Sequence, residues 1–101
     1  MSAPVTLTFR HLPPSGALES SAREIGQRLN ALHHRMTACH IVLEGNRDAR
    51  QSQAPYQVKI HLSVPGAQIH AESVHAEARN PLQSAYENAK RQLEKLKRMQ
   101  S

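Results

Sequence analysis

The segment from Tyr56 to Ala71 constrains the fold of this chain more than any other part of the sequence. Apolar residues occupy every second position from Tyr56 to Val64, and polar residues lie between them. This is the pattern of a strand with one buried face. Pro65-Gly66 then favours a tight turn, and apolar residues resume at Ile69 and Ala71. The segment therefore predicts a β-hairpin.

The parity of this alternation also predicts the register of the hairpin, because a two-residue turn fixes which residues face each other. The expected pairs are Leu62 with Ile69, Ile60 with Ala71, Lys59 with Glu72 and His61 with His70. A four-residue turn keeps the same faces inward. We therefore expect Val58, Ile60 and Leu62 to be buried. Lys59 and His61 are expected to be exposed on the other face.

Three further elements are expected before the hairpin. Alternating apolar residues predict a strand over residues 5–10. Ser15 can cap a helix, and apolar residues at spacings of three and four predict that this helix runs from about Gly16 to about His33. Gly26 is a weak point within it. A nearly continuous apolar run predicts another strand over Thr37–Glu44.

After the second strand, residues 45–55 are polar and rich in turn formers, so we expect a mobile loop carrying Arg47 and Arg50. The last element is a second helix, because Asn80 is a good N-cap and Pro81 suits the first helical position. Its apolar stripe consists of Leu82, Ala85, Tyr86, Ala89, Leu93 and Leu96.

The predicted element order is βαβββα, which indicates an α+β fold. A sheet with one polar face and two amphipathic helices favours a four-stranded, mainly antiparallel sheet with both helices packed on one face. The 101 residues contain no linker-like stretch, so we expect a single domain over residues 1–101, folding alone or as a homodimer.

Charge and composition narrow the class of partner. Thirteen Lys and Arg against eight Asp and Glu give a net charge of +5, which favours a polyanion such as nucleic acid. Two Tyr, one Phe and no Trp argue against base stacking on an aromatic platform. A single cysteine fits a reducing compartment. No signal peptide or membrane-spanning run is evident, so we expect a cytoplasmic protein without a membrane partner.

The densest cationic cluster lies near the C-terminus. At about 100° per residue, its five basic residues occupy an arc of roughly 160° opposite the apolar stripe. Such an array suits phosphate contacts, each of which releases counterions. The alternative interpretation is that these cations only favour the helix macrodipole and keep the surface soluble. With Arg23 and Arg28 of the first helix as an extension, the candidate RNA-binding residues are Arg23, Arg28, Lys90, Arg91, Lys95, Lys97 and Arg98.

Neither a metal site nor an active site is expected. Seven histidines invite a metal hypothesis, and His61, His70 and nearby His40 are the one group with plausible geometry. Lone surface histidines are nevertheless the ordinary case, and no spaced ligand motif is present. Cys39 is expected to be a small buried hydrophobe. Without a glycine-rich phosphate loop or a nucleophile motif, we expect no catalytic residues, no cofactor and no small-molecule substrate.

Several segments together resemble one family, the ribosome hibernation promoting factors and the ribosome-associated inhibitor, also called sigma-54 modulation proteins. The resemblance rests on the βαβββα order and covers nearly the whole chain. The segments that carry it are Thr37–Glu44, Tyr56–Gly66 and Ala89–Lys95. It implies the short form of the family, since no dimerisation domain follows Ser101.

The resemblance implies binding to the small ribosomal subunit, through 16S ribosomal RNA, where messenger RNA and transfer RNA anticodons lie. It also implies that translation is silenced in stress or stationary phase. Lys90, Arg91, Lys95 and Lys97 match the family's basic positions. Two departures point to a divergent branch: Asn88 stands where lysine is common, and residues 77–83 replace the usual start of the second helix. The alternative is a regulatory module on the same fold that binds another RNA or a protein.

Overall fold

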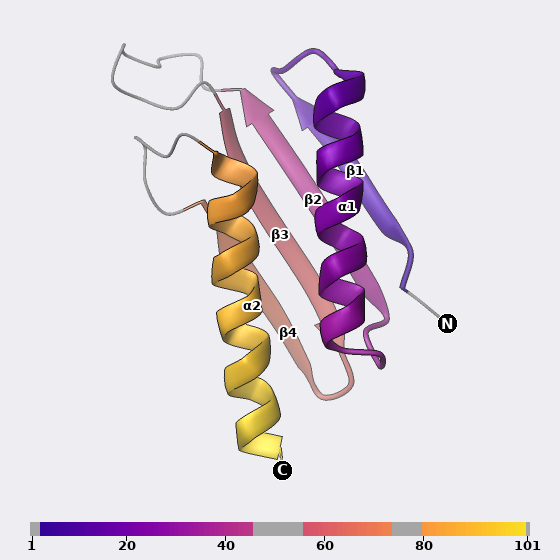
Figure 1. Ribbon diagram of the computed structural model, residues 1–101, viewed down its shortest axis with the longest axis vertical. Coiled ribbons are helices and arrows are strands. Elements are labelled where there is room, and N and C mark those ends of the chain that lie inside the picture. The colour runs from indigo at the N-terminus through magenta and orange to yellow at the C-terminus, as the bar shows by residue number, and fades with distance from the viewer. Residues whose placement is uncertain (1–2, 46–55, 74–79, 101) are drawn as a thin grey trace.

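The computed structural model describes residues 3–45, 56–73 and 80–100. Its elements are β1 (Val5–Arg10), α1 (Gly16–Leu32), β2 (Ala38–Gly45), β3 (Tyr56–Val64), β4 (Ala67–Glu72) and α2 (Pro81–Gln100). The βαβββα order is confirmed (Figure 1). The boundaries differ slightly from those predicted, because α1 ends one residue earlier and β2 continues through Gly45. The expected loop with Arg47 and Arg50 lies outside the described residues.

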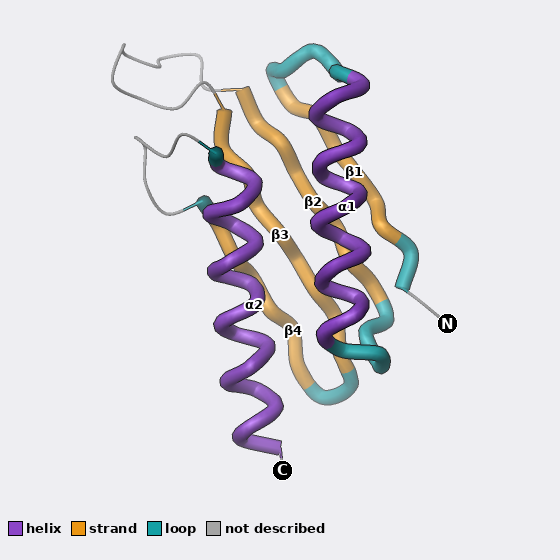
Figure 2. Tube along the Cα trace, viewed as in Figure 1, coloured by secondary structure: helices purple, strands orange, loops and turns teal. Residues whose placement is uncertain are grey.

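The four strands form one sheet in the order β1-β2-β3-β4. Strand β1 is parallel to β2, whereas β2–β3 and β3–β4 are antiparallel. The parallel pair is joined through α1, because parallel neighbours need a crossover connection. Both helices cover the same face of the sheet, side by side and running in the same direction (Figures 1 and 2). The predicted α+β fold with a mainly antiparallel sheet is therefore confirmed.

The register of the β3–β4 hairpin is the predicted one, with all four expected pairs in place. Gly66 in the turn has a φ of 82°, a conformation that glycine adopts without steric cost. Val58, Ile60 and Leu62 are buried and His61 is exposed, as expected. The prediction for Lys59 was wrong, because this residue is half-buried. It lies on a central strand between Val42 and Glu72, and such neighbours cover its aliphatic stem.

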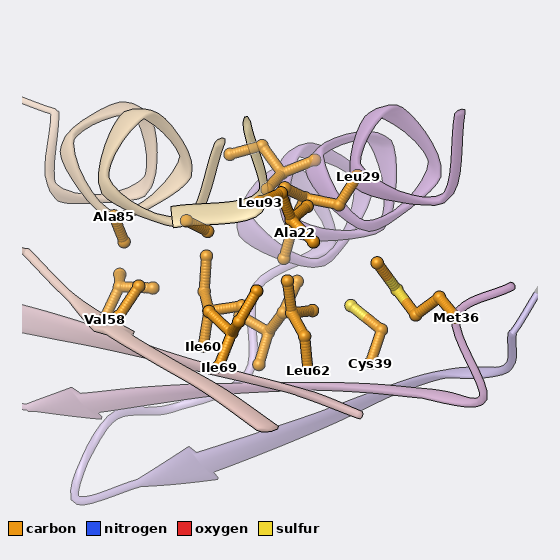
Figure 3. Close-up of a cluster of buried hydrophobic side chains, with 14 of the residues drawn as sticks. Ala22, Leu29, Met36, Cys39, Val58, Ile60, Leu62, Ile69, Ala85 and Leu93 are labelled. Carbon is orange, nitrogen blue, oxygen red and sulfur yellow. The ribbon is translucent and has the colours of Figure 1, made fainter. Parts of the chain in front are cut away.

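The hydrophobic core lies between the inner face of the sheet and the two helices. Figure 3 shows Cys39, Ile60 and Leu62 directed from the strands toward side chains of α1 and α2. Cys39 is 1% exposed, and burial raises the pKa of its thiol to about 11. The thiol is therefore neutral at physiological pH and packs as a small hydrophobe, which confirms the predicted inward position of Cys39.

The first helix begins and packs as its sequence dictates. The side chain of Ser15 accepts a hydrogen bond from the backbone N–H of Leu18 at 3.4 Å, which confirms the predicted N-cap. Gly26 is buried against β1, and a Cβ atom placed there would lie 2.7 Å from both Cγ atoms of Val5. Gly26 therefore gives up helix propensity to allow the close approach of α1 to β1.

The assignment of the faces of β3 can be tested with Ile60→Asp. Ile60 is fully buried, so the substitution would place an unpaired charge in the core. We expect the free energy of unfolding to fall by about 4 kcal/mol or more, measured by urea denaturation. The matched control is Gln68→Asp on the exposed face of β4, which should change stability by less than about 0.5 kcal/mol. Native-like stability of Ile60→Asp would refute the assignment.

The contact between α1 and β1 predicts a coupled pair of substitutions. In the wild-type background, the Cβ of Gly26→Ala collides with the stiff β-branched side chain of Val5, and overpacking outweighs the gain in helix propensity. We expect a loss of stability of about 1 kcal/mol. In a Val5→Ala background the same change should stabilise the protein, because the colliding methyl groups are gone. Equal effects in both backgrounds, measured by thermal unfolding, would contradict this contact.

Candidate nucleic-acid interface

The start of α2 follows the predicted capping pattern. The side-chain oxygen of Asn80 accepts a hydrogen bond from the backbone N–H of Gln83 at 3.2 Å, and Pro81 is the first helical residue. Four members of the apolar stripe are buried in the core, namely Leu82, Ala85, Ala89 and Leu93. The stripe therefore decides which side of α2 faces the sheet.

Two side-chain amides fasten α2 to the edge strand β4. The Nε2 group of Gln92 donates to the carbonyl oxygen of His70 at 2.9 Å, and Nδ2 of Asn88 donates to that of Glu72 at 3.2 Å. Gln92 also donates to Oδ1 of Asn88 at 3.1 Å. These bonds satisfy carbonyl groups at the sheet edge and fix the rotation of α2 about its axis. Asn88, at a position where the resembled family commonly has lysine, thus has a structural role.

With α2 held in this way, its cationic side faces solvent. We call this surface the cationic face; it consists of Lys90, Arg91, Lys95, Lys97 and Arg98, all of which are exposed. Glu94 is the one acidic residue between Lys90 and Arg98. Among the described residues, no carboxylate lies within ion-pair distance of Lys90, Arg91, Lys95 or Lys97. Their charges are therefore available to an external anion.

The position of the last two cations also fits the alternative interpretation. Lys97 and Arg98 lie in the final turn of α2, where the helix macrodipole favours positive charge. Lys90 and Arg91 lie two turns earlier, beyond the reach of that effect, which falls off within the last turn. The macrodipole therefore accounts for only part of the cationic face.

The two arginines of α1 are differently placed. Arg23 pairs with Glu19 at 3.3 Å and Arg28 pairs with Glu24 at 2.7 Å, in both cases one helical turn apart and half-exposed. Arg28 borders a groove between α1 and the start of α2. Arg23 instead borders a hollow between α1 and the N-terminal residues that lead into β1. The structure thus gathers the five cations of α2, sets Arg28 beside the second helix and separates Arg23 from it.

Arg35 is an exposed cation that the sequence patterns did not single out. It lies in the turn between α1 and β2, and its backbone N–H donates to Nδ1 of His33 at 3.3 Å. This turn is at the same end of the molecule as the C-terminal turns of α2 (Figure 1). Turn residues have no periodic signal, so only the tertiary arrangement shows that the turn carrying Arg35 lies toward this end of the molecule.

The open face of the sheet has a different character. Its fixed charges are balanced, with Arg10 and Lys59 against Glu44 and Glu72. A row of histidines also crosses this face. The pKa of His61 is lowered, first by partial burial and then by the neighbouring histidines and Lys59, so its ring is neutral at physiological pH. Among the residues that the structure describes, the excess positive charge is therefore on the helix side.

Other kinds of site find little support in the part of the chain that the structure describes. No three histidine, cysteine or carboxylate side chains converge there as a group able to hold a metal ion. None of the described helices combines the length and apolar character that a membrane crossing requires. The cationic face is accordingly the strongest candidate site.

Comparisons with solved structures identify the fold. A ribosomal subunit interface protein from Coxiella burnetii superposes with a TM-score of 0.75 at 18% identity, covering 93% of this chain and 97% of that chain. The N-terminal domain of Protein Y from Thermus thermophilus gives a TM-score of 0.69 at 16% identity, covering 95% and 99%. At these identities the likeness establishes the fold alone. A search of curated proteins found no match.

The family comparison covers nearly the whole sequence. Residues 5–101 match the model described as sigma 54 modulation protein / S30EA ribosomal protein. The match begins at the first residue of β1 and includes both helices, so it takes in every element of the fold. The chain therefore belongs to the sigma 54 modulation protein / S30EA ribosomal protein family.

Proposed function

We propose that this protein binds the small ribosomal subunit through 16S ribosomal RNA near the decoding channel and silences translation under stress or in stationary phase. The observation that carries the proposal is the cationic face of α2, whose five basic side chains are exposed on one side of an anchored helix. Family membership supports a ribosomal partner, as does the name of the Coxiella burnetii structure, a ribosomal subunit interface protein.

The chemistry of the cationic face suits the RNA backbone rather than the bases. Lysine and arginine neutralise phosphates and release condensed counterions, which gives affinity without sequence selection. All three aromatic residues, Phe9, Tyr56 and Tyr86, are partly buried against the core, so they offer no open stacking platform. Because α2 is fastened to β4, the cations are held in a fixed array before binding, which lowers the entropic cost of association.

In this proposal the protein silences translation by occupying the decoding channel, and no chemical reaction is required. A small domain bound where messenger RNA and anticodons lie excludes them sterically. In this proposal residues 1–101 act as one ribosome-binding domain in the cytoplasm, with no cofactor. Lys90, Arg91, Lys95, Lys97 and Arg98 are the primary phosphate contacts. Arg28 can join them only by exchanging its pairing with Glu24 for a phosphate, and Arg23 contributes least because it lies on the far flank of α1.

A second candidate function is the regulation of another RNA or a protein by the same fold. Two observations favour it. Helix α2 begins at Pro81, and Asn88 bonds to the edge strand where the resembled family commonly presents a lysine. Both features alter the surface next to the cationic face. Co-sedimentation with ribosomes distinguishes the two candidates, because only the first requires the protein to travel with the small subunit.

The role of the cationic face can be tested by replacing Lys90, Arg91, Lys95 and Lys97 with Gln. We expect weaker binding to the small subunit and a salt dependence whose slope is shallower by up to about one unit per lost phosphate contact. Because binding is weakened, the variant should also no longer inhibit translation in vitro. Stability should change little, because exposed substitutions usually stay within about 0.5 kcal/mol each.

The matched control removes the same kind of charge from the opposite face. Lys90→Gln with Arg91→Gln is compared with Arg10→Gln and Lys59→Gln, which lower the net charge by the same amount. We expect the first pair to weaken ribosome binding considerably more than the second. Equal losses would mean that net charge drives association. An unchanged affinity and salt slope in the helix variant would refute the proposed interface.

A further inference from the structure

Three histidines lie in a row across neighbouring strands on the open face of the sheet. His40 of β2 faces His61 of β3, which in turn faces His70 of β4. The rings of His61 and His70 meet edge to face with their centroids 4.2 Å apart, whereas the rings of His40 and His61 are 6.3 Å apart. The row therefore contains one close pair, formed by His61 and His70.

The close pair has its Nδ1 atoms turned toward each other at 3.1 Å. Zinc–imidazole bonds are about 2.0–2.1 Å long, so two nitrogen ligands in tetrahedral geometry lie roughly 3.3 Å apart. The observed separation is thus close to that of two ligands on one cation. Two directly opposed strand positions hold this spacing. The two atoms now share a hydrogen bond, so its proton has to leave before both nitrogens can bind one ion.

A carboxylate orients one ring of the pair. The Nε2 atom of His70 lies 3.2 Å from Oε1 of Glu72. An ionised carboxylate can only accept, so Nε2–H of His70 donates to Glu72, and Nδ1 is the nitrogen of that ring that faces His61. Metal-binding histidines commonly donate their second ring N–H to a carboxylate in this way.

We propose that His61 and His70 form a binding site for a divalent cation that prefers imidazole ligands, such as Zn²⁺, with Glu72 positioning His70. Borderline cations of this class take neutral imidazole nitrogens, whereas Mg²⁺ prefers oxygen ligands. His40 does not complete the site, because its ring centroid lies 6.3 Å from that of His61 and no three possible ligands converge among the described residues. The remaining coordination positions belong to water or to an external ligand. This site was not expected from the sequence, which predicted ordinary surface histidines.

Isothermal titration of the full chain with ZnCl₂ at neutral pH tests the proposal. We expect one Zn²⁺ per chain, and no binding of Mg²⁺ under the same conditions. His61→Gln and His70→Gln should each weaken Zn²⁺ binding at least tenfold. The matched control is His34→Gln, an exposed histidine outside the row, which should bind Zn²⁺ like the wild type. Glu72→Gln leaves both ligands in place and should weaken binding by about tenfold through lost orientation of His70.

Backbone amide NMR spectra distinguish this site from binding elsewhere on the chain. Zn²⁺ should shift resonances of residues around His61 and His70 on β3 and β4, and the spectra of the variants should verify their fold. Absence of binding in the wild type, or an equal loss in His34→Gln, would overturn the proposal. The site is independent of the proposed ribosome binding, since it lies on the opposite side of the sheet from α2. The double variant with His61→Gln and His70→Gln should still associate with ribosomes.

Discussion

The inner face of the central strands β2 and β3 has to be covered, and this requirement organises the molecule. Four side chains on that face are fully buried, namely Ile41, Leu43, Val58 and Ile60. A single sheet leaves both of its faces open to water, so this burial requires a second layer. Two amphipathic helices supply that layer, and their apolar stripes determine which of their sides remain in water. The close packing of α1 depends on Gly26, and that of α2 on small residues such as Ala85 and Ala89.

Covering one face of the sheet also divides the chemistry of the surface. The helix side carries the excess positive charge, on the part of α2 that cannot face the core. The open side of the sheet has balanced fixed charges and a row of histidines. Because exposed cations contribute little to folding, the charge on α2 can serve a polyanionic partner without a large cost in stability. The helix side and the open side of the sheet therefore suit different kinds of ligand, although both are supported by the same small core.

Side chains of α2 protect an edge that would otherwise be open. The outward carbonyl groups of β4 accept hydrogen bonds from Gln92 and Asn88, so α2 covers the edge strand as well as the inner face of the sheet. This arrangement opposes pairing of β4 with another strand. The same two bonds fix the rotation of the helix and hence the direction of its cationic face. Protection of the edge and presentation of the charge thus have one structural cause.

Much of the fold could be read from the sequence, because periodicity and capping are local. Alternation around Pro65-Gly66 determined the hairpin register, and Ser15 and Asn80 marked the starts of the helices. The cationic arc of α2 follows equally from helical geometry. Other features depend on contacts between segments far apart in the chain. Only the tertiary structure decided that Lys59 is half-buried and that a side chain at position 26 would collide with Val5. It also decided that Arg28 borders the start of α2, whereas Arg23 borders the residues that lead into β1. It likewise set the 3.1 Å distance between the Nδ1 atoms of His61 and His70. The strand register predicts that these two residues face each other, but their side-chain rotamers determine how far apart the ring atoms lie.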